Sequence, residues 1–150
     1  MLSTVEKVLF LKSVDLFTRI NGEDLAQVAG IAQEVVFENG ELIIQEGEVG
    51  DSMFLIIEGD VMVHRMTQQI AKLGEREAFG EMAILDHEPR SASVTAMSDT
   101  TCLKVEREDF YELMSEKPEI AHGIIRVLTH RLREVNKRLS DSSPPAGGHA

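Results

Sequence analysis

The chain has 150 residues, of which 43% are hydrophobic and 27% are charged, which suits one compact domain with a real core. Its 15 Lys and Arg residues against 26 Asp and Glu residues give a net charge of −11, which argues against a nucleic-acid or anionic-membrane surface. The single cysteine, Cys102, excludes an internal disulfide and a cysteine-based zinc site, and fits a reducing compartment.

Residues 1–32 are predicted to be helical. Apolar residues recur at helical spacing from Val5 to Phe17. A second, shorter helix is predicted over residues 22–32, directly after Asn21, whose side chain suits an N-cap. No apolar run reaches the roughly 18–20 residues that span a bilayer, and we find no signal peptide, so we expect a cytoplasmic chain without membrane insertion.

Residues 33–105 change to a β pattern. Short β-rich segments are separated by turn signals such as Asn39-Gly40, and we interpret Gly47, Gly50 and Gly59 as turn formers chosen for positive φ. The predicted strands cover Glu34–Phe37, Leu42–Gln45, Met53–Ile57, Val61–Met66, Gln69–Leu73, Ser91–Met97 and Thr101–Val105. This spacing predicts a mainly β fold, an antiparallel eight-stranded β-roll or jelly roll.

Residues 106–139 return to a helical pattern. A short helix is predicted over Asp109–Ser115, and a long one over Glu119–Leu139 with Pro118 in its first turn. Apolar residues on the long helix form a seam at spacings of 3, 4, 3 and 4, namely Ile125, Leu128, Leu132, Val135 and Leu139. Residues 1–139 are therefore expected to form one domain, and residues 140–150 a disordered tail.

The segment Phe79–Ala92 carries the clearest chemistry. A tight Gly-Glu turn leads into one short apolar helical turn, and the chain returns through Pro89 to a single arginine, Arg90. The backbone N–H groups that begin a helix and a guanidinium fork can hold one small anion. Glu81 would repel a phosphate, so we expect it to accept hydrogen bonds from a sugar hydroxyl. An anion beside a hydroxyl indicates a nucleotide.

Two motifs resemble those of the cyclic nucleotide-binding domain family. The first is Glu46–Val61, a glycine-punctuated double turn around a strand; the second is Phe79–Ala92, which resembles the phosphate-binding cassette of that family. The resemblance covers residues 5–139 and implies a β-roll with a short cassette helix, N-terminal helices and a long C-terminal helix. It also implies a regulatory sensor that binds cAMP or cGMP as ligand, with no other cofactor.

The resemblance assigns roles to individual residues of the cassette. Arg90 would pair with the oxygens of the cyclic phosphate, and Glu81 would accept from the ribose 2′-hydroxyl beside the backbone of Gly80. Backbone N–H groups of Ala83 and Ser91 would complete the anion site. The remaining cassette positions expected at the ligand are Phe79, Met82 and Ala92. The long helix would cover the base, with Arg133, Val135 and Asn136 as candidate contacts.

Simpler roles are compatible with single residues. Arg90 alone could be a surface arginine after a turn proline, and Glu81 could serve only the N-terminus of its helix, an interaction of about 0.3–1 kcal/mol. The cassette context favours the ligand role for both. Arg76 stands where the family often has glycine, so we expect a locally different turn there.

Catalysis and metal binding are not expected. The histidines at 64, 87, 122, 130 and 149 show no metal-ligand pairing, and no Ser-His-Asp arrangement, P-loop or spaced carboxylate pair is present. We therefore expect no enzyme activity and no metal site.

Three functions remain open after the resemblance is considered. The first is a cyclic-nucleotide sensor, with cAMP favoured over cGMP, that transmits occupancy through its C-terminal helix. The second is a ligand-free scaffold of the same fold that forms a homodimer through residues 119–139; the presence of both Glu81 and Arg90 disfavours it. The third is the sensor part of a larger effector such as a transcription regulator, kinase or transporter, although no nucleic-acid contact is expected from this chain itself.

Overall fold

The computed structural model describes residues 1–142, apart from the side chains of Met82, Ala83 and Ser142. Its helices are α1 (Thr4–Lys12), the 3-10 turn η1 (Asp15–Phe17), α2 (Gly22–Ile31), α3 (Glu81–Asp86), α4 (Arg107–Glu116) and α5 (Pro118–Ser142). Its strands are β1 (Ala32–Phe37), β2 (Leu42–Ile44), β3 (Ser52–Glu58), β4 (Val61–Arg65), β5 (Gln68–Leu73), β6 (Ala78–Phe79), β7 (Ser93–Ala96) and β8 (Thr100–Glu106).

The N-terminal helices begin at good caps. Ser3 and Glu6 form a capping box at the start of α1, and the Asn21 side chain accepts from the Asp24 N–H at 2.8 Å at the start of α2. The single helix predicted up to Phe17 is wrong, because α1 ends at Lys12 and Val14 is extended, with φ −84° and ψ 126°. This break lets the following 3-10 turn bury its apolar side chains.

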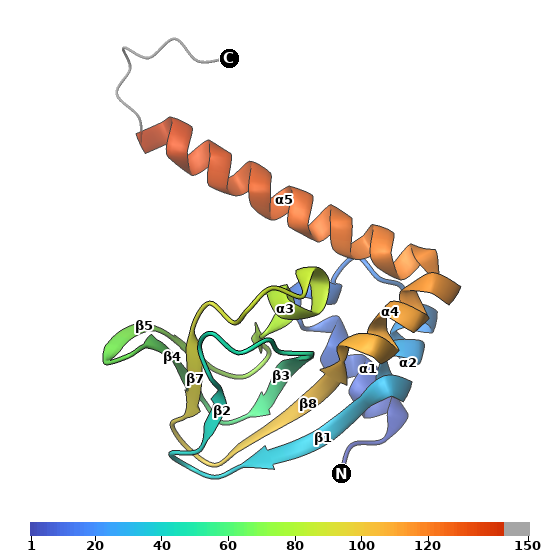
Figure 1. Ribbon diagram of the computed structural model, residues 1–150. Helices are drawn as coiled ribbons and strands as arrows, with labels where there is room; N and C mark the ends of the chain where they lie inside the picture. Colours follow the sequence, from blue (N-terminus) through green and yellow to red (C-terminus); the bar gives the residue numbers. More distant parts are fainter. Residues whose placement is uncertain (143–150) are drawn as a thin grey trace.

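The strands confirm the predicted antiparallel β-roll. They form two four-stranded sheets with the orders β1-β8-β3-β6 and β2-β7-β4-β5, in which every pairing is antiparallel. The short strand β6 was missed in the sequence, because two residues are too few to show an alternating pattern. Figure 1 shows the two sheets curving around a common interior, with α1, α2 and α4 grouped at one end of the roll.

Alternation along β3 divides the core into two clusters. Met53 and Leu55 point to the helices, where they pack with Phe17 and Phe110 among others. Phe54 and its neighbours on the opposite face point into the roll. Both faces of β3 are buried, which explains why its sequence is continuously apolar rather than alternating.

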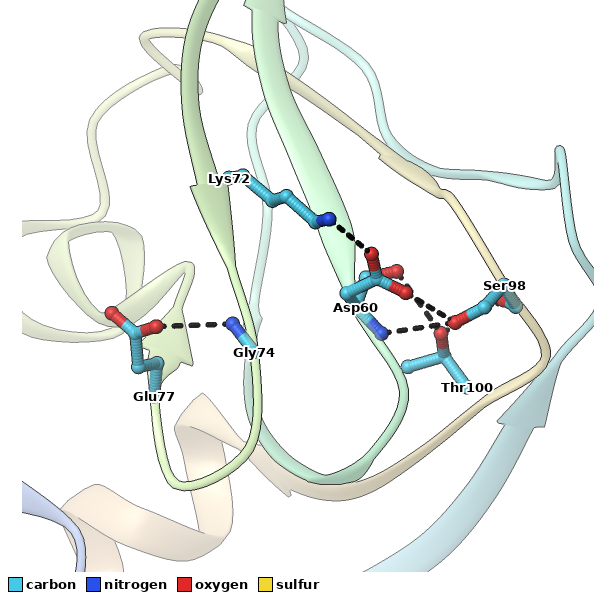
Figure 2. Close-up of polar contacts among 6 residues, drawn as sticks. All are labelled: Asp60, Lys72, Gly74, Glu77, Ser98 and Thr100. Carbon is cyan, nitrogen blue, oxygen red and sulfur yellow. Dashed lines mark hydrogen bonds and ion pairs between the residues drawn. The ribbon is translucent and has the colours of Figure 1, made fainter.

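A polar network closes the end of the roll at the β3–β4 turn (Figure 2). The Asp60 carboxylate pairs with Lys72 on β5 at 3.1 Å and accepts from the Ser98 hydroxyl at 2.5 Å. The Thr100 hydroxyl lies 3.2 Å from the backbone oxygen of Asp60. In the next turn, the Glu77 carboxylate accepts from the Gly74 N–H at 3.0 Å. The Asp60 contacts tie the β3–β4 turn to β5 and to the β7–β8 turn, and the Glu77 contact closes the turn between β5 and β6.

The last helix is longer than the sequence indicated. It includes residues 140–142, which the sequence analysis assigned to the tail, and the rest of that predicted tail lies outside the described residues. In Figure 1 the second half of α5, drawn in red, projects beyond the other helices. Within residues 1–142 no helix combines the length and the apolar character that crossing a bilayer requires.

Candidate ligand-binding site

A cavity of about 310 Å³ opens on the roll beside the 79–92 segment. Its apolar wall comes from both sheets and consists of Ile44, Val63, Leu73, Ala78, Phe79 and Val94. The remaining wall comes from the 79–92 segment itself, with Gly80, Glu81, Asp86, Glu88, Pro89, Arg90, Ser91 and Ala92. An apolar hollow with a few polar groups on one side is typical of a small-molecule site.

Backbone carbonyl groups hold the guanidinium of Arg90 in the wall of this cavity. Its Nη1 donates to the Gly80 oxygen at 3.0 Å, and its Nη2 donates to the Ser52 oxygen at 2.7 Å. A guanidinium has five N–H donors, so these two bonds orient the fork without using all of its donors. The side chain is part-buried and oriented rather than free in solvent.

Two glycines make room for that guanidinium. A Cβ atom on Gly80 would lie 2.7 Å from Nη1 of Arg90, and one on Gly50 would lie 1.9 Å from its Nε. Gly50 does not have the positive φ that was predicted for it, so that interpretation is wrong; glycine is required there by the close approach of Arg90. Gly47, with φ 87°, and Gly59, with φ 101°, do have the positive φ that was predicted.

Backbone pairing joins the two sequence motifs. The Arg90 N–H donates to the Glu48 oxygen at 2.8 Å, and the Gly47 N–H donates to the Arg90 oxygen at 2.9 Å. Val49 and Pro89 form an isolated antiparallel bridge between these bonds. The glycine-rich turn of the first motif therefore holds the arginine of the second motif.

The charges around Arg90 are unevenly distributed. Burial lowers the pKa of the Arg90 guanidinium from its ordinary value, and the negative charges of Asp51 and Glu81 oppose that shift. An arginine stays protonated at any physiological pH. The fixed guanidinium can neutralise one small anion, and the neighbouring carboxylate can accept a hydrogen bond from a hydroxyl group of the same ligand.

The structure brings most of the predicted cassette residues to one cavity. Its lining includes Phe79, Gly80, Glu81, Arg90, Ser91 and Ala92. Met82 and Ala83 belong to α3 by their backbone, but their side chains lie outside the described part of the molecule.

The candidate base contacts lie elsewhere. Arg133, Val135 and Asn136 are exposed on the second half of α5 and do not line the cavity. The first half of that helix is anchored, because Ile120 and Ile124 are buried in the helical core. In this structure the three candidate base contacts therefore do not lie in the cavity that the cassette residues line.

Between the buried first half of α5 and the candidate base contacts, Arg131 pairs with Asp15 of η1, with Nε 2.9 Å from the carboxylate. The ion pair is largely exposed, so it orients the helix more than it stabilises the fold.

Sequence reasoning missed several contributors to the site. The apolar wall was not predicted, although Val63 of β4 and Val94 of β7 are cross-strand partners on one face. Ser52 acts through its backbone oxygen, for which a side-chain pattern carries no signal. Arg76 has φ 71°, so the arginine adopts the left-handed conformation that glycine favours. Among residues 1–142, no three His, Cys, Asp or Glu side chains are placed to hold a metal ion.

Comparisons with known proteins find relatives that match most of this chain. The family model described as "Cyclic nucleotide-binding domain" matches residues 34–117. The chain is 29% identical over 136 residues to a CRP-like cAMP-activated global transcriptional regulator of Mycobacterium tuberculosis, covering 87% of this chain and 61% of that one. It is 33% identical over 134 residues to the cyclic AMP receptor protein of Thermus thermophilus, covering 86% and 62% respectively. The chain thus spans about three-fifths of the length of these relatives.

A solved structure extends the comparison to the fold. The N-terminal domain of a transcriptional regulator from Streptomyces coelicolor A3(2) superposes with a TM-score of 0.78 at 29% identity. The match covers 92% of this chain and 98% of that domain. The similarity therefore includes the flanking helices as well as the roll.

Proposed function

The chain belongs to the cyclic nucleotide-binding domain family, and on this premise we propose that it is a regulatory, non-catalytic sensor for a 3′,5′-cyclic mononucleotide, with cAMP favoured over cGMP. The observation that carries the proposal is the placement of Arg90 between Gly80 and Ser52 in a cavity that Glu81 also lines. One fixed cation and one neighbouring carboxylate match the phosphodiester and the 2′-hydroxyl of a single ligand. The names of the two curated relatives, which specify cAMP, support the preference.

The cassette residues have distinct roles in this proposal. Arg90 pairs with the phosphate oxygens, while backbone N–H groups of Ala83 and Ser91 complete the anion site. Glu81 and the Gly80 backbone bind the ribose. Phe79, Met82 and Ala92 shape the segment that surrounds the ligand. The apolar wall of the cavity, including Val63 and Leu73, offers a surface to the base or the ribose.

The second half of α5 would close over the base. Arg133, Val135 and Asn136 are exposed and reach the ligand only if this half moves toward the roll. The apolar seam residues Leu132 and Val135 are 60% and 46% exposed, so closure would bury apolar surface. A ligand shifts such an equilibrium only by its differential affinity for the two arrangements. A spin-label distance between α5 and β4, measured with and without cAMP, tests this closure.

Calorimetric titration with cAMP and cGMP tests the proposal directly. We expect saturable binding, tighter for cAMP. Arg90→Ala and Arg90→Lys should each weaken it roughly 10- to 100-fold, because charged hydrogen bonds contribute about 1.5–3 kcal/mol each and lysine lacks the fork. Arg126→Ala, on an exposed face of α5, is the matched control. Unchanged affinity in the Arg90 variants would contradict the site assignment.

The alternative function is a ligand-free scaffold that dimerises through residues 119–139. One observation on α5 supports this alternative. The seam residues Ile125, Leu128, Leu132, Val135 and Leu139 are all exposed in the single chain. Absence of heat with either nucleotide, together with a dimer in sedimentation equilibrium, would support the scaffold.

Because the matched relatives are longer than this chain, we propose that any effector, including DNA binding, belongs to a further domain or partner. A cytoplasmic location is likewise a proposal that rests on the lone Cys102.

A further inference from the structure

Two successive backbone carbonyl groups hold the end of the cassette. The Arg90 oxygen accepts from the Gly47 N–H at 2.9 Å, and the Ser91 oxygen accepts from Nε of Arg65 at 2.8 Å. A trans peptide group is planar, so its N–H points away from its C=O. The first bond therefore sets the direction of the Ser91 N–H, and the second bond sets the direction of the Ala92 N–H.

The residues that follow Arg90 are not held by the sheet. Ser91 and Ala92 form a bend outside the strands, directly before β7. In the described chain, the pairing of β4 with β7 ends at His64 and Ser93. Both bend residues line the cavity, and the Ser91 N–H has a proposed role at the phosphate. The position of this backbone therefore depends on contacts such as the one from Arg65.

Arg65 extends from a backbone that is itself anchored. It is the last residue of β4 and follows directly after the pairing with β7 ends. The ring of the preceding residue, His64, joins the two strands, with Nε2 2.9 Å from the Thr95 hydroxyl on β7. Its Nδ1 lies 3.1 Å from the Met66 oxygen in the hairpin turn. The strand end that carries the arginine is therefore fixed next to the bend.

The guanidinium of Arg65 is a charged donor without a carboxylate partner. Among residues 1–142 it forms no ion pair, and its described hydrogen bond is the one to the Ser91 oxygen. An ionised donor makes a stronger hydrogen bond than a neutral one. This bond is exposed to solvent, so its net contribution is modest. The arginine also brings a second positive charge close to Arg90, so charge and hydrogen bonding have to be separated by experiment.

We propose that Arg65 is a positioning residue of the cyclic-nucleotide site, which holds the Ser91–Ala92 peptide so that the end of the cassette keeps the arrangement that binds the phosphate. The inference rests on the proposed function of that site. A site that is ordered before the ligand arrives loses less conformational entropy on binding. Without the bond from Arg65 the bend is free to rearrange, and binding weakens although every group assigned to the ligand is still present.

Two neutral variants separate the hydrogen bond from the charge. In Arg65→Gln the amide nitrogen is attached to Cδ, as Nε is in arginine, so a donor remains at the same place along the side chain. Arg65→Met has a similar length and no donor. In calorimetry with cAMP we expect Arg65→Met to bind roughly three- to ten-fold more weakly, and Arg65→Gln to recover most of that loss. Because both variants lack the charge, the difference between them reports the hydrogen bond alone.

The amide-nitrogen NMR shift of Ala92 reports the same bond in the ligand-free chain. That nitrogen belongs to the peptide group whose oxygen Arg65 binds. The shift should move in Arg65→Met and return toward its original value in Arg65→Gln. Arg126→Met removes one positive charge from an exposed position of α5 and is the matched control. It should change neither the Ala92 shift nor the affinity for cAMP.

The outcomes keep the two proposals apart. If cAMP binds but the two Arg65 variants lose the same affinity, or neither loses any, Arg65 does not position the site and the sensor stands. An unchanged Ala92 shift in Arg65→Met would overturn the inference in the same way. If cAMP does not bind the unmodified chain at all, the proposed function itself fails, and the role of Arg65 fails with it.

Discussion

A Cβ atom on Gly50 would lie 1.9 Å from Nε of Arg90, so the guanidinium occupies the space that a side chain at position 50 would fill. The two residues are 40 positions apart in the sequence and belong to different motifs. Pairing between Val49 and Pro89 brings their backbones together. The position of the proposed phosphate ligand thus depends on the absence of a single methyl group.

We predict that Gly50→Ala displaces the Arg90 side chain and weakens cyclic-nucleotide binding roughly 10- to 100-fold, as the loss of one or more charged hydrogen bonds would. Because Gly50 does not have a positive φ, alanine should not strain its backbone. Calorimetry with cAMP measures the effect. Gly74→Ala is the control, since a Cβ there would meet nothing within 4 Å. Equal affinities for the two variants would contradict the steric argument.

An aromatic row supports the wall of the cavity from inside the roll. The Phe54 ring stacks on Phe79 at a centroid distance of 5.1 Å and meets Phe37 edge-on at 5.7 Å. We predict that Phe54→Ala lowers the free energy of unfolding by about 3–5 kcal/mol, through lost burial and a cavity. Urea unfolding followed by circular dichroism suits a chain without tryptophan. Val36→Ala, at an exposed position of β1, should cost under about 0.5 kcal/mol.

The Asp60 network makes stability depend on acidic pH. Hydrogen bonding from Ser98, and then the contact with Lys72, lowers the pKa of Asp60 from its ordinary value of 3.8. Because the pKa of Asp60 is lower in the folded chain, its ionised carboxylate contributes fully to the stability of the fold above pH 3.8. That contribution disappears as the pH falls through the pKa of the folded state. We predict that Asp60→Asn is less stable than the unmodified chain at pH 7 and that the gap narrows below pH 3.8.

Urea midpoints between pH 2 and pH 7 measure that gap. Glu75→Gln, an exposed carboxylate in the neighbouring turn, is the control and should show no such narrowing. A gap of constant size across this range would show that the charge of Asp60 is irrelevant to stability.

Cys102 is predicted to be unreactive in the folded protein. The residue is fully buried in the roll, and burial raises the pKa of its thiol to about 12. We expect no labelling by a thiol-disulfide reagent at pH 8 until urea unfolds the chain. A second cysteine introduced as Ser115→Cys, at an exposed position, should react at once and verify the reagent. Rapid labelling of Cys102 under native conditions would mean that the roll opens.

The cassette was readable because its residues are contiguous. Residues 79–92 contain the turn, the short helix and the arginine in one stretch, so local pattern located the segment that supplies one wall of the cavity. The strands were readable for a similar reason, since their limits follow turn residues and alternation. Errors fell where the local signal is short or ambiguous, as at the two-residue strand β6 and at the helix break before Val14.

The sequence by itself determined the fold class, the family and the segment that holds the proposed ligand, because each is encoded in neighbouring residues. Only the tertiary structure revealed why position 50 is glycine and which backbone oxygens orient Arg90. It also placed the second half of α5 away from the cavity lining. Such relationships join residues far apart in the chain, and a contact through backbone atoms leaves no side-chain pattern from which to predict it.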